Sequence, residues 1–188
     1  GLRDLQFGER LEGLLEQVIV ARDTVCADGG RRVPLLLKLA PDLSPQEREA
    51  IAGMVIKSPS GDSTTPRSGI DGLIIGNTTL SRPETLQSCH RHEAGGLSGC
   101  PLFSLSTEVL RDFHHLTGGR LPLIGVGGVA SGRDAYLKIR AGASLIQLYT
   151  AFAYHGPALI GRIAEELSDL LREDGYSSIV EAVGADVP

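Results

Sequence analysis

Residues 121–132 read LPLIGVGGVASG, a strand-like run followed by a glycine turn and a helix start. The apolar part predicts a buried strand at 121–126, and Ser131 predicts the cap of a helix at 131–140. Glycines lack a Cβ and let backbone N–H groups approach a ligand closely, and a helix start adds partial positive charge. The stretch therefore predicts a phosphate-binding loop. A plain tight turn remains the alternative, because the spacing fits the dinucleotide-binding fingerprint poorly.

The same alternation of apolar runs and helical periodicity continues on both sides of this stretch. Residues 34–40 are almost wholly apolar and predict a strand buried on both faces. Strands alternating with helices predict a parallel sheet, either in a doubly wound fold or in a (β/α)8 barrel. Periodicity does not choose between the two. Further strands are predicted at 70–76 and 144–149, and further helices at 9–24, from Ser44 onward, at 105–116 and at 157–173.

Residues 58–69, SPSGDSTTPRSG, interrupt this rhythm with polar residues that have no apolar period. We interpret them as a flexible surface insertion, because such loops are added at little entropic cost. The 188-residue chain as a whole is 41% hydrophobic, which is enough to bury a core, and it predicts a single globular unit.

Composition excludes several classes of function. The net charge is -5 and the chain has no basic block, so neither a nucleic-acid groove nor a polybasic membrane patch is indicated. Cys26, Cys89 and Cys100 have no metal-ligand spacing and are interpreted as bystander thiols. No apolar run approaches the roughly 20 residues of a spanning helix. Because the chain begins at Gly1-Leu2-Arg3 without a Met, we expect it to be a fragment.

Polar and glycine-rich groups follow several of the predicted strands. Lys38 is the only charge in its apolar strand, and Asn77-Thr78 follow the next one. A buried ammonium needs an anion or an electron-rich partner, unless the side chain reaches solvent at the strand end. Residues 147–150 end the last strand, and the last two loops of a barrel are where its phosphate sites usually lie. Residues 95–99, GGLSG, could close over the same ligand.

Five strings stand together in a specific order, although each alone is weak: KLAPDL (38–43), NTT (77–79), GGLSGCPL (95–102), IGVGGV (124–129) and IRAGASLIQLYT (139–150). Through these strings the chain resembles the quinone-dependent, membrane-associated branch of the dihydroorotate dehydrogenases. The resemblance covers nearly the whole chain, apart from residues 58–69. The ending at 182–186, AVGAD, is similar to eukaryotic members.

The resemblance implies a partial (β/α)8 TIM barrel, about its last four βα units. Residues 1–188 would be the C-terminal half of a single FMN-binding domain. Lys38 would lie at the flavin ring, and Asn77 and Thr78 would hydrogen-bond the substrate. The remaining residues implied to hold FMN are Ser98, Gly99, Val126, Gly127, Gly128, Leu148, Tyr149 and Thr150.

The implied reaction is the oxidation of dihydroorotate to orotate in pyrimidine (UMP) biosynthesis. FMN would accept the hydride, and ubiquinone would reoxidise the flavin. The catalytic base would be a serine just upstream of Gly1, so no catalytic residue is assigned within this chain. Tyr149 and Pro157 would border the quinone tunnel. The resemblance also implies the mitochondrial inner membrane, with contact through an N-terminal region that this chain does not contain.

One departure from the family pattern and two alternative interpretations stay open. Gly76 stands where the family usually has a hydroxyl residue beside the flavin. The chain could belong to another FMN- or phosphate-binding barrel oxidoreductase that shares only the phosphate loops. It could also be a catalytically silent half-barrel or an interaction module, because half a barrel leaves strand edges unpaired. For the same reason, we expect the isolated chain to have little activity and poor solubility.

Overall fold

The computed structural model describes residues 8–27, 31–56 and 69–188, and residues 58–68 of the predicted insertion lie outside these ranges. Each predicted strand and helix is present within a few residues of its expected bounds. In chain order the elements are α1 (Gly8–Ala27), β1 (Leu36–Leu39), α2 (Pro45–Ile56), β2 (Gly72–Ile75), the 3-10 helix η2 (Cys100–Leu102), α3 (Phe103–Thr117), β3 (Leu123–Val126), α4 (Gly132–Arg140), β4 (Leu145–Gln147), α5 (Thr150–His155), α6 (Ala158–Glu173) and α7 (Ile179–Ala182).

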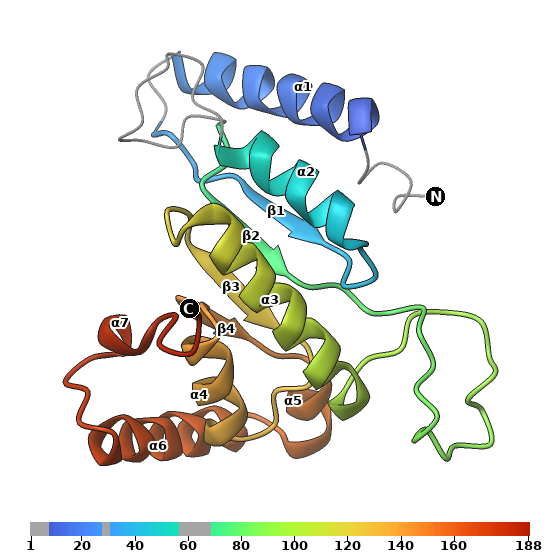
Figure 1. Ribbon diagram of the computed structural model, residues 1–188, viewed down its shortest axis with the longest axis vertical. Helices are drawn as coiled ribbons and strands as arrows, with labels where there is room; N and C mark the ends of the chain where they lie inside the picture. The colour runs from blue at the N-terminus through green and yellow to red at the C-terminus, as the bar shows by residue number, and fades with distance from the viewer. Residues whose placement is uncertain (1–7, 28–30, 57–68) are drawn as a thin grey trace.

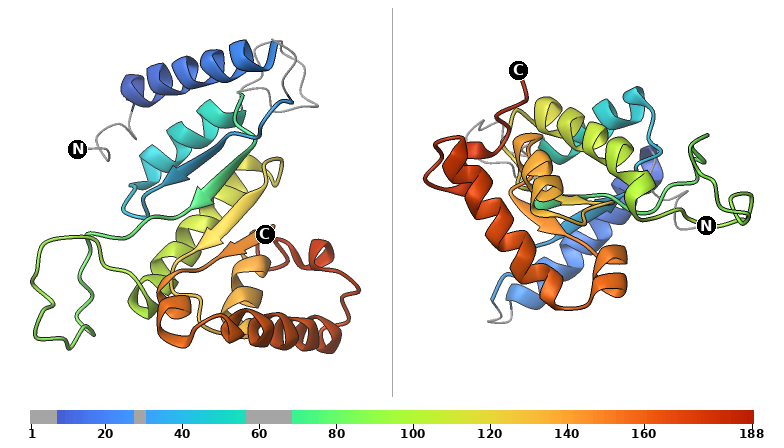
Figure 2. Two further views of the ribbon diagram at one scale, coloured as in Figure 1. Left: turned by 180° about the vertical axis from the view of Figure 1, so that it is seen from behind. Right: turned by 90° about the horizontal axis from the view of Figure 1, so that it is seen from below.

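The four strands form one parallel sheet in the order β1-β2-β3-β4, so every strand pairs with its neighbour in sequence. The helices that follow the first three strands, α2, α3 and α4, lie along the same face of that sheet (Figures 1 and 2). A doubly wound sheet would reverse its strand order and carry helices on both faces. The observed arrangement is instead that of successive βα units of a barrel.

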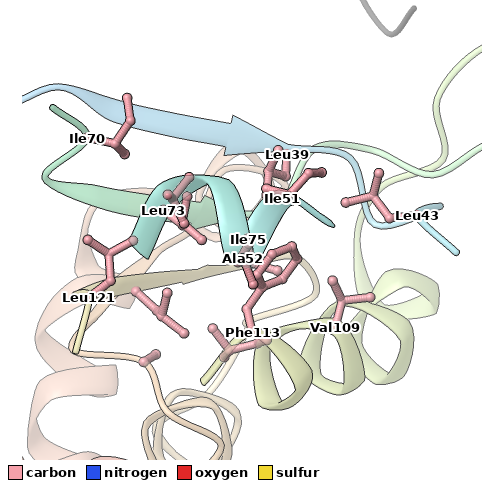
Figure 3. Close-up of a cluster of buried hydrophobic side chains, with 14 of the residues drawn as sticks. Leu39, Leu43, Ile51, Ala52, Ile70, Leu73, Ile75, Val109, Phe113 and Leu121 are labelled. Atoms are coloured by element: carbon pink, nitrogen blue, oxygen red, sulfur yellow. The ribbon is translucent and has the colours of Figure 1, made fainter. Parts of the chain in front are cut away.

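The core lies between this face of the sheet and its helices (Figure 3). Leu39, Leu73, Ile75 and Leu123 alternate along three strands and are 0% exposed. Helices α2 and α3 cover them with further apolar side chains, including the fully buried Phe113. Removing each such side chain from water stabilises the fold by about 1.5–3 kcal/mol. This packing holds the strand ends, and the loops that follow them, at one edge of the sheet.

The other face of the sheet is much more open. Leu36 in β1 and Leu145 in β4 are 40% and 61% exposed, and Lys38 shares this face. The prediction that the first strand is buried on both faces is therefore wrong on one face. Alternate side chains of a strand point to opposite sides, and no helix among the described residues covers this side, which would be the inner face of a barrel.

Capping hydrogen bonds mark the starts of α2 and α4, and the cap at Ser131 was predicted from the sequence. The backbone N–H of Ser44 donates to Glu47 Oε2 at 2.7 Å, and the N–H of Glu47 donates back to Ser44 Oγ at 3.4 Å, which is the capping box of α2. Ser131 caps α4 by accepting from the N–H of Asp134. The sequence interpretation missed η2, α5 and α7, which have three to six residues and are too short for helical periodicity to show.

Candidate functional site

A pocket of about 630 Å³ lies at the carboxyl ends of the four strands. Each strand or the loop that follows it contributes to its walls, as expected for parallel strands whose ends share one edge. All eleven residues assigned to FMN or to the substrate line this pocket, whereas Pro157, assigned to the quinone tunnel, is not in its lining. The eleven residues are Lys38, Asn77, Thr78, Ser98, Gly99, Val126, Gly127, Gly128, Leu148, Tyr149 and Thr150.

The turn after β3 forms one wall of the pocket. Gly128 has a φ of +75°, and a Cβ at this position would lie 2.5 Å from Cβ of Phe103, the first residue of α3. Only glycine fits this close approach. Within the described residues, no hydrogen bond uses the backbone N–H of Gly128 or of Thr150. Gly128 in this turn and Thr150 after β4 can therefore each offer a main-chain donor to an anion.

The start of α4 does not contribute its positive end to the pocket, which corrects the expected phosphate cradle in one respect. Two carboxylates already occupy the amides there. Asp134 accepts from the N–H of Ala130 at 3.0 Å, and Glu166 of α6 accepts from the N–H of Gly132 at 2.6 Å. Because these negative charges neutralise the helix end, the free main-chain donors on this side are left to the glycine turn and not to the start of α4.

The loop after β4 closes the same side of the pocket. Thr150 Oγ1 donates to Ser98 Oγ at 3.1 Å, which joins this loop to the segment before α3. Helix α5 starts at Thr150 and brings Tyr154 and His155 to the pocket, two residues that the sequence interpretation missed. The aromatic Tyr149 and Tyr154 are 81% and 83% exposed. A short helix after the last strand of a barrel is the signal that could have located them.

The opposite side of the pocket is built from the ends of β1 and β2. The N–H of Asn77 donates to the carbonyl of Leu39 at 2.8 Å, which continues the sheet into the loop. The carboxylate of Asp42 accepts from Thr79 Oγ1 and from the N–H of Leu80. Asp42 thus ties the loop after β1 to the loop after β2, and Lys38 lies beside Asn77 and Thr78 in the lining.

The long connection between β2 and α3 is organised by one side chain. The guanidinium of Arg82 donates to the carbonyls of Arg91 at 3.1 Å, Glu93 at 2.9 Å and Gly95 at 2.8 Å. It also donates to the carbonyls of Leu80 and Ser81. An antiparallel bridge between Thr79 and Leu97 closes the base of this loop. Residues 79–97 therefore form an ordered excursion that leads directly from Thr78 to Ser98.

Gly76 lies in the pocket wall between β2 and Asn77. A Cβ at this position would lie 2.9 Å from the carbonyl oxygen of Leu39, so a side chain would require the backbone to shift. The backbone found here therefore does not accommodate the hydroxyl residue that the family pattern has at this place.

Of the cysteines considered from the sequence, Cys100 lines the pocket, whereas Cys89 lies outside it, as does His114. His114 is half-buried between two turns of the chain, and burial lowers the pKa of its imidazole. Cys89, His90 and His92 are exposed on the excursion loop. In the described ranges, no group of three or more His, Cys, Asp or Glu residues could hold a metal ion.

Together these groups suit a ligand that carries a phosphate. Main-chain donors and hydroxyls gather on the β3 and β4 side, and a cation with an amide lies on the β1 and β2 side. The volume falls within the range of about 300–1,000 Å³ that is typical of small-molecule sites. No residue of the lining is an evident general base next to Asn77.

The chain that forms this pocket is similar in sequence to proteins of one family. Residues 1–171 match the family model described as dihydroorotate dehydrogenase. The chain is 53% identical over 187 residues to the mitochondrial dihydroorotate dehydrogenase (quinone) of Oryza sativa, covering 99% of this chain and 38% of that protein. It is 49% identical over 187 residues to the dihydroorotate dehydrogenase (quinone) of Azorhizobium caulinodans, covering 100% of this chain and 50% of that protein.

Solved structures support the same relationship. The chain superimposes on ligand-free DHODH from Eimeria tenella with a TM-score of 0.88 and 36% identity, covering 99% of this chain and 52% of that one. The chain thus spans about half the length of the curated relatives it matches. Both bacterial and mitochondrial proteins are among them.

Proposed function

The chain belongs to the dihydroorotate dehydrogenase family, and we propose that it supplies the FMN site and one wall of the substrate site in an enzyme that oxidises dihydroorotate to orotate. A quinone would be the final electron acceptor, and the product would enter pyrimidine biosynthesis. The observation that carries the proposal is the convergence of Lys38, Asn77, Gly128 and Thr150 on one pocket. These residues come from four successive βα units, with Lys38 in β1 itself and Thr150 at the start of α5.

The pocket residues fit FMN by their chemistry. The N–H groups of Gly128 and Thr150, with that of Tyr149, would hold the phosphate, because main-chain donors in a glycine turn bind such anions. Ser98 and Gly99 would contact the phosphate end of FMN. Further contacts with the cofactor would come from Val126, Gly127 and Leu148. When bound, FMN would supply the hydride-accepting chemistry. Lys38 would place a positive charge beside the ring and stabilise negative charge that develops there.

Asn77 and Thr78 would orient the substrate. An amide offers both donors and an acceptor, and a hydroxyl offers one of each, which matches the alternating N–H and C=O groups of a dihydropyrimidine ring. We expect the proton to be removed by a serine that lies upstream of Gly1. The residues of this chain would therefore bind, orient and stabilise charge, and the base would come from outside it.

The quinone would reach the site near α5. Tyr149 and Tyr154 form an exposed aromatic surface beside the pocket, and Pro157 follows that helix. In the described ranges, no helix is both long enough and apolar enough to cross a membrane. We propose that membrane contact uses an N-terminal region. We also propose the mitochondrial inner membrane as the location, on the basis of the similarity to mitochondrial relatives.

Flavin reduction in the intact protein tests the proposal. FMN-loaded protein mixed anaerobically with dihydroorotate should lose its flavin absorbance and regain it on addition of a ubiquinone analogue. The substitution Lys38→Met should slow the loss of flavin absorbance (bleaching) by about 100-fold or more, since losing one preorganised electrostatic partner has effects of that size. FMN should stay bound, because the phosphate donors are intact.

Arg162→Met, an exposed change on α6 outside the pocket, is the matched control and should leave the rate unchanged. Dihydrouracil, which lacks the carboxylate, tests substrate class. Faster bleaching by dihydrouracil than by dihydroorotate would contradict the proposed substrate, and an unchanged rate in Lys38→Met would contradict the proposed role of the lysine.

A further inference from the structure

Lys138 in α4 is a charged side chain with none of its surface exposed. Its Nζ donates to Ser106 Oγ at 2.8 Å and to Thr107 Oγ1 at 2.9 Å, both on α3. The same Nζ lies 4.9 Å from the centroid of the Phe103 ring. Burying an ammonium is costly unless such partners surround it. The environment of Lys138 is therefore built to hold a polar head group in the interior.

This buried lysine lies directly beneath the pocket wall formed by β3. A Cβ at Gly125 would come within 3.1 Å of Lys138 Cδ, so the first glycine of the IGVGGV string makes room for the lysine stem. The next two glycines of that string, Gly127 and Gly128, line the pocket. Lys138 thus packs against the same short backbone segment that carries Gly127 and Gly128.

Ser106 connects the lysine to that segment. Its Oγ lies 3.2 Å from the carbonyl oxygen of Gly127 and 3.1 Å from that of Phe103. An ammonium has no lone pair, so the serine hydrogen must point toward these carbonyls while the lysine is charged. Thr107 donates only to the carbonyl of Phe103, at 2.7 Å, and does not reach the glycine turn.

The hydrogen bond from Ser106 to the Gly127 carbonyl fixes the orientation of the peptide between Gly127 and Gly128. Its C=O and N–H point in opposite directions because the bond is trans. When the Gly127 carbonyl is held toward Ser106, the N–H of Gly128 is directed to the other side of the peptide. That N–H is one of the proposed phosphate donors.

We propose that Lys138 is a positioning residue for the ligand phosphate, which acts through Ser106 to hold the Gly127–Gly128 peptide and which adds a positive charge beneath the turn. This inference rests on the proposed FMN site. It assigns a role to a buried charge that neither substrate binding nor electron transfer requires.

Burial lowers the pKa of Lys138 to about 7, and Asp134 on the same helix raises it in part. The groups that face the ammonium from α3 are two hydroxyls and an aromatic ring, and β3 presents Gly125. From α6, Glu166 is engaged by the N–H of Gly132. A neutral amine can accept a hydrogen from Ser106 and release the Gly127 carbonyl. Phosphate affinity should therefore fall as the pH rises through about 7.

Binding of FMN and of riboflavin by the flavin-free intact protein tests this role, with flavin fluorescence as the readout. Riboflavin has the same ring and ribityl chain without the phosphate. Lys138→Met and Ser106→Ala should each weaken FMN binding by about tenfold, the effect of one well-oriented hydrogen bond to a charged group. Riboflavin binding should change by less than about twofold, because that ligand does not use the phosphate donors.

Thr107→Val is the matched control. It also removes a hydroxyl partner of Lys138, but one that does not contact the glycine turn, so the ratio of FMN to riboflavin affinity should be preserved. If Lys138→Met fails to fold, Ser106→Ala still tests whether the link from Lys138 to the Gly127 carbonyl affects phosphate binding. Between pH 6.5 and 8.5 the ratio of FMN to riboflavin affinity should fall in the unmodified protein. In Lys138→Met the ratio should change only through the phosphate's own ionisation, which has a pKa near 6.

The outcomes separate this inference from the proposed function. If the unmodified protein prefers FMN and both Lys138→Met and Ser106→Ala retain that preference, Lys138 has no positioning role and the FMN site stands. If the unmodified protein binds FMN no better than riboflavin, the phosphate site itself is wrong, and the inference falls with it. Loss of preference in both variants, with Thr107→Val unaffected, is the expected result.

Discussion

Lys138 carries an ionisable amine that has no access to solvent in the folded protein. Burial lowers the pKa of this amine from 10.5 in water to about 7. In the unfolded chain the amine keeps its proton until the pH approaches 10.5. Between these two pH values the unfolded state binds the additional proton, so the free energy of unfolding rises with pH. Below pH 7 both states are protonated, and the fold bears the full cost of a buried charge.

Lys138→Met should remove this pH dependence while preserving the length of the side chain. From pH 7.5 to 9, the unfolding free energy of the unmodified protein should rise relative to that of the variant, by about 1.4 kcal/mol per pH unit. Urea unfolding of both proteins at several pH values measures the difference. A difference that stays constant over this range would show that the amine is not neutral in the folded state.

At the scale of elements, the excursion of residues 79–97 depends on the single side chain of Arg82. A guanidinium has five N–H donors in a planar fork, whereas an ammonium has three on one atom. Lysine therefore cannot reproduce all of the contacts, which join Arg82 to the carbonyls of Leu80, Ser81, Arg91, Glu93 and Gly95. This loop has little buried apolar surface, and its order depends on these hydrogen bonds.

Arg82→Lys should loosen the excursion and weaken binding at Asn77 and Thr78, which immediately precede it. We expect the KM for dihydroorotate to rise by about tenfold, the effect of losing about 1.4 kcal/mol of binding free energy, with little change in Tm. Hydrogen exchange of residues 80–96 should speed up. Arg91→Lys is the control, because within the described ranges that exposed side chain on the same loop donates a hydrogen bond only to the neighbouring His92. Equal effects of the two changes would refute the special role of Arg82.

At the scale of the whole molecule, the sheet has an open inner face and two edge strands within the described residues. Leu36 on β1 and Leu145 on β4 are exposed at these edges. Unpaired strands with apolar side chains are templates for association. The curated relatives are about twice as long as this chain, which leaves room for strands that would pair with both edges.

The polypeptide 1–188 expressed alone should self-associate and oxidise dihydroorotate poorly. Leu145→Lys should increase its solubility, because a charge on an edge strand opposes pairing with another chain. Val180→Lys on α7 adds the same charge at another exposed position, away from the sheet, and should have little effect. Size-exclusion chromatography of the three proteins measures this, and a monomeric, fully active 1–188 would contradict it.

Local patterns were enough to predict most of the elements and the rim of the pocket. Lys38, Asn77 and the glycine turn each stand at the end of an apolar run, and parallel strands bring such ends to one edge. Ser44 with Glu47, and Ser131 with Asp134, were predictable as caps because both partners lie within one helical turn. The short helix α5, with Tyr154 and His155, was not predictable from periodicity because it has fewer than two turns.

The sequence by itself determined the alternation of strands and helices, the caps and the polar groups that follow the strands, because these depend on residues close together in the chain. Only the tertiary structure decided between a barrel and a doubly wound sheet, since strand order is set by long-range pairing. It alone revealed that Glu166 closes the start of α4 from 34 residues away. It alone placed Lys138 beneath Gly127, because contacts between α4, α3 and β3 exist only once the core has packed.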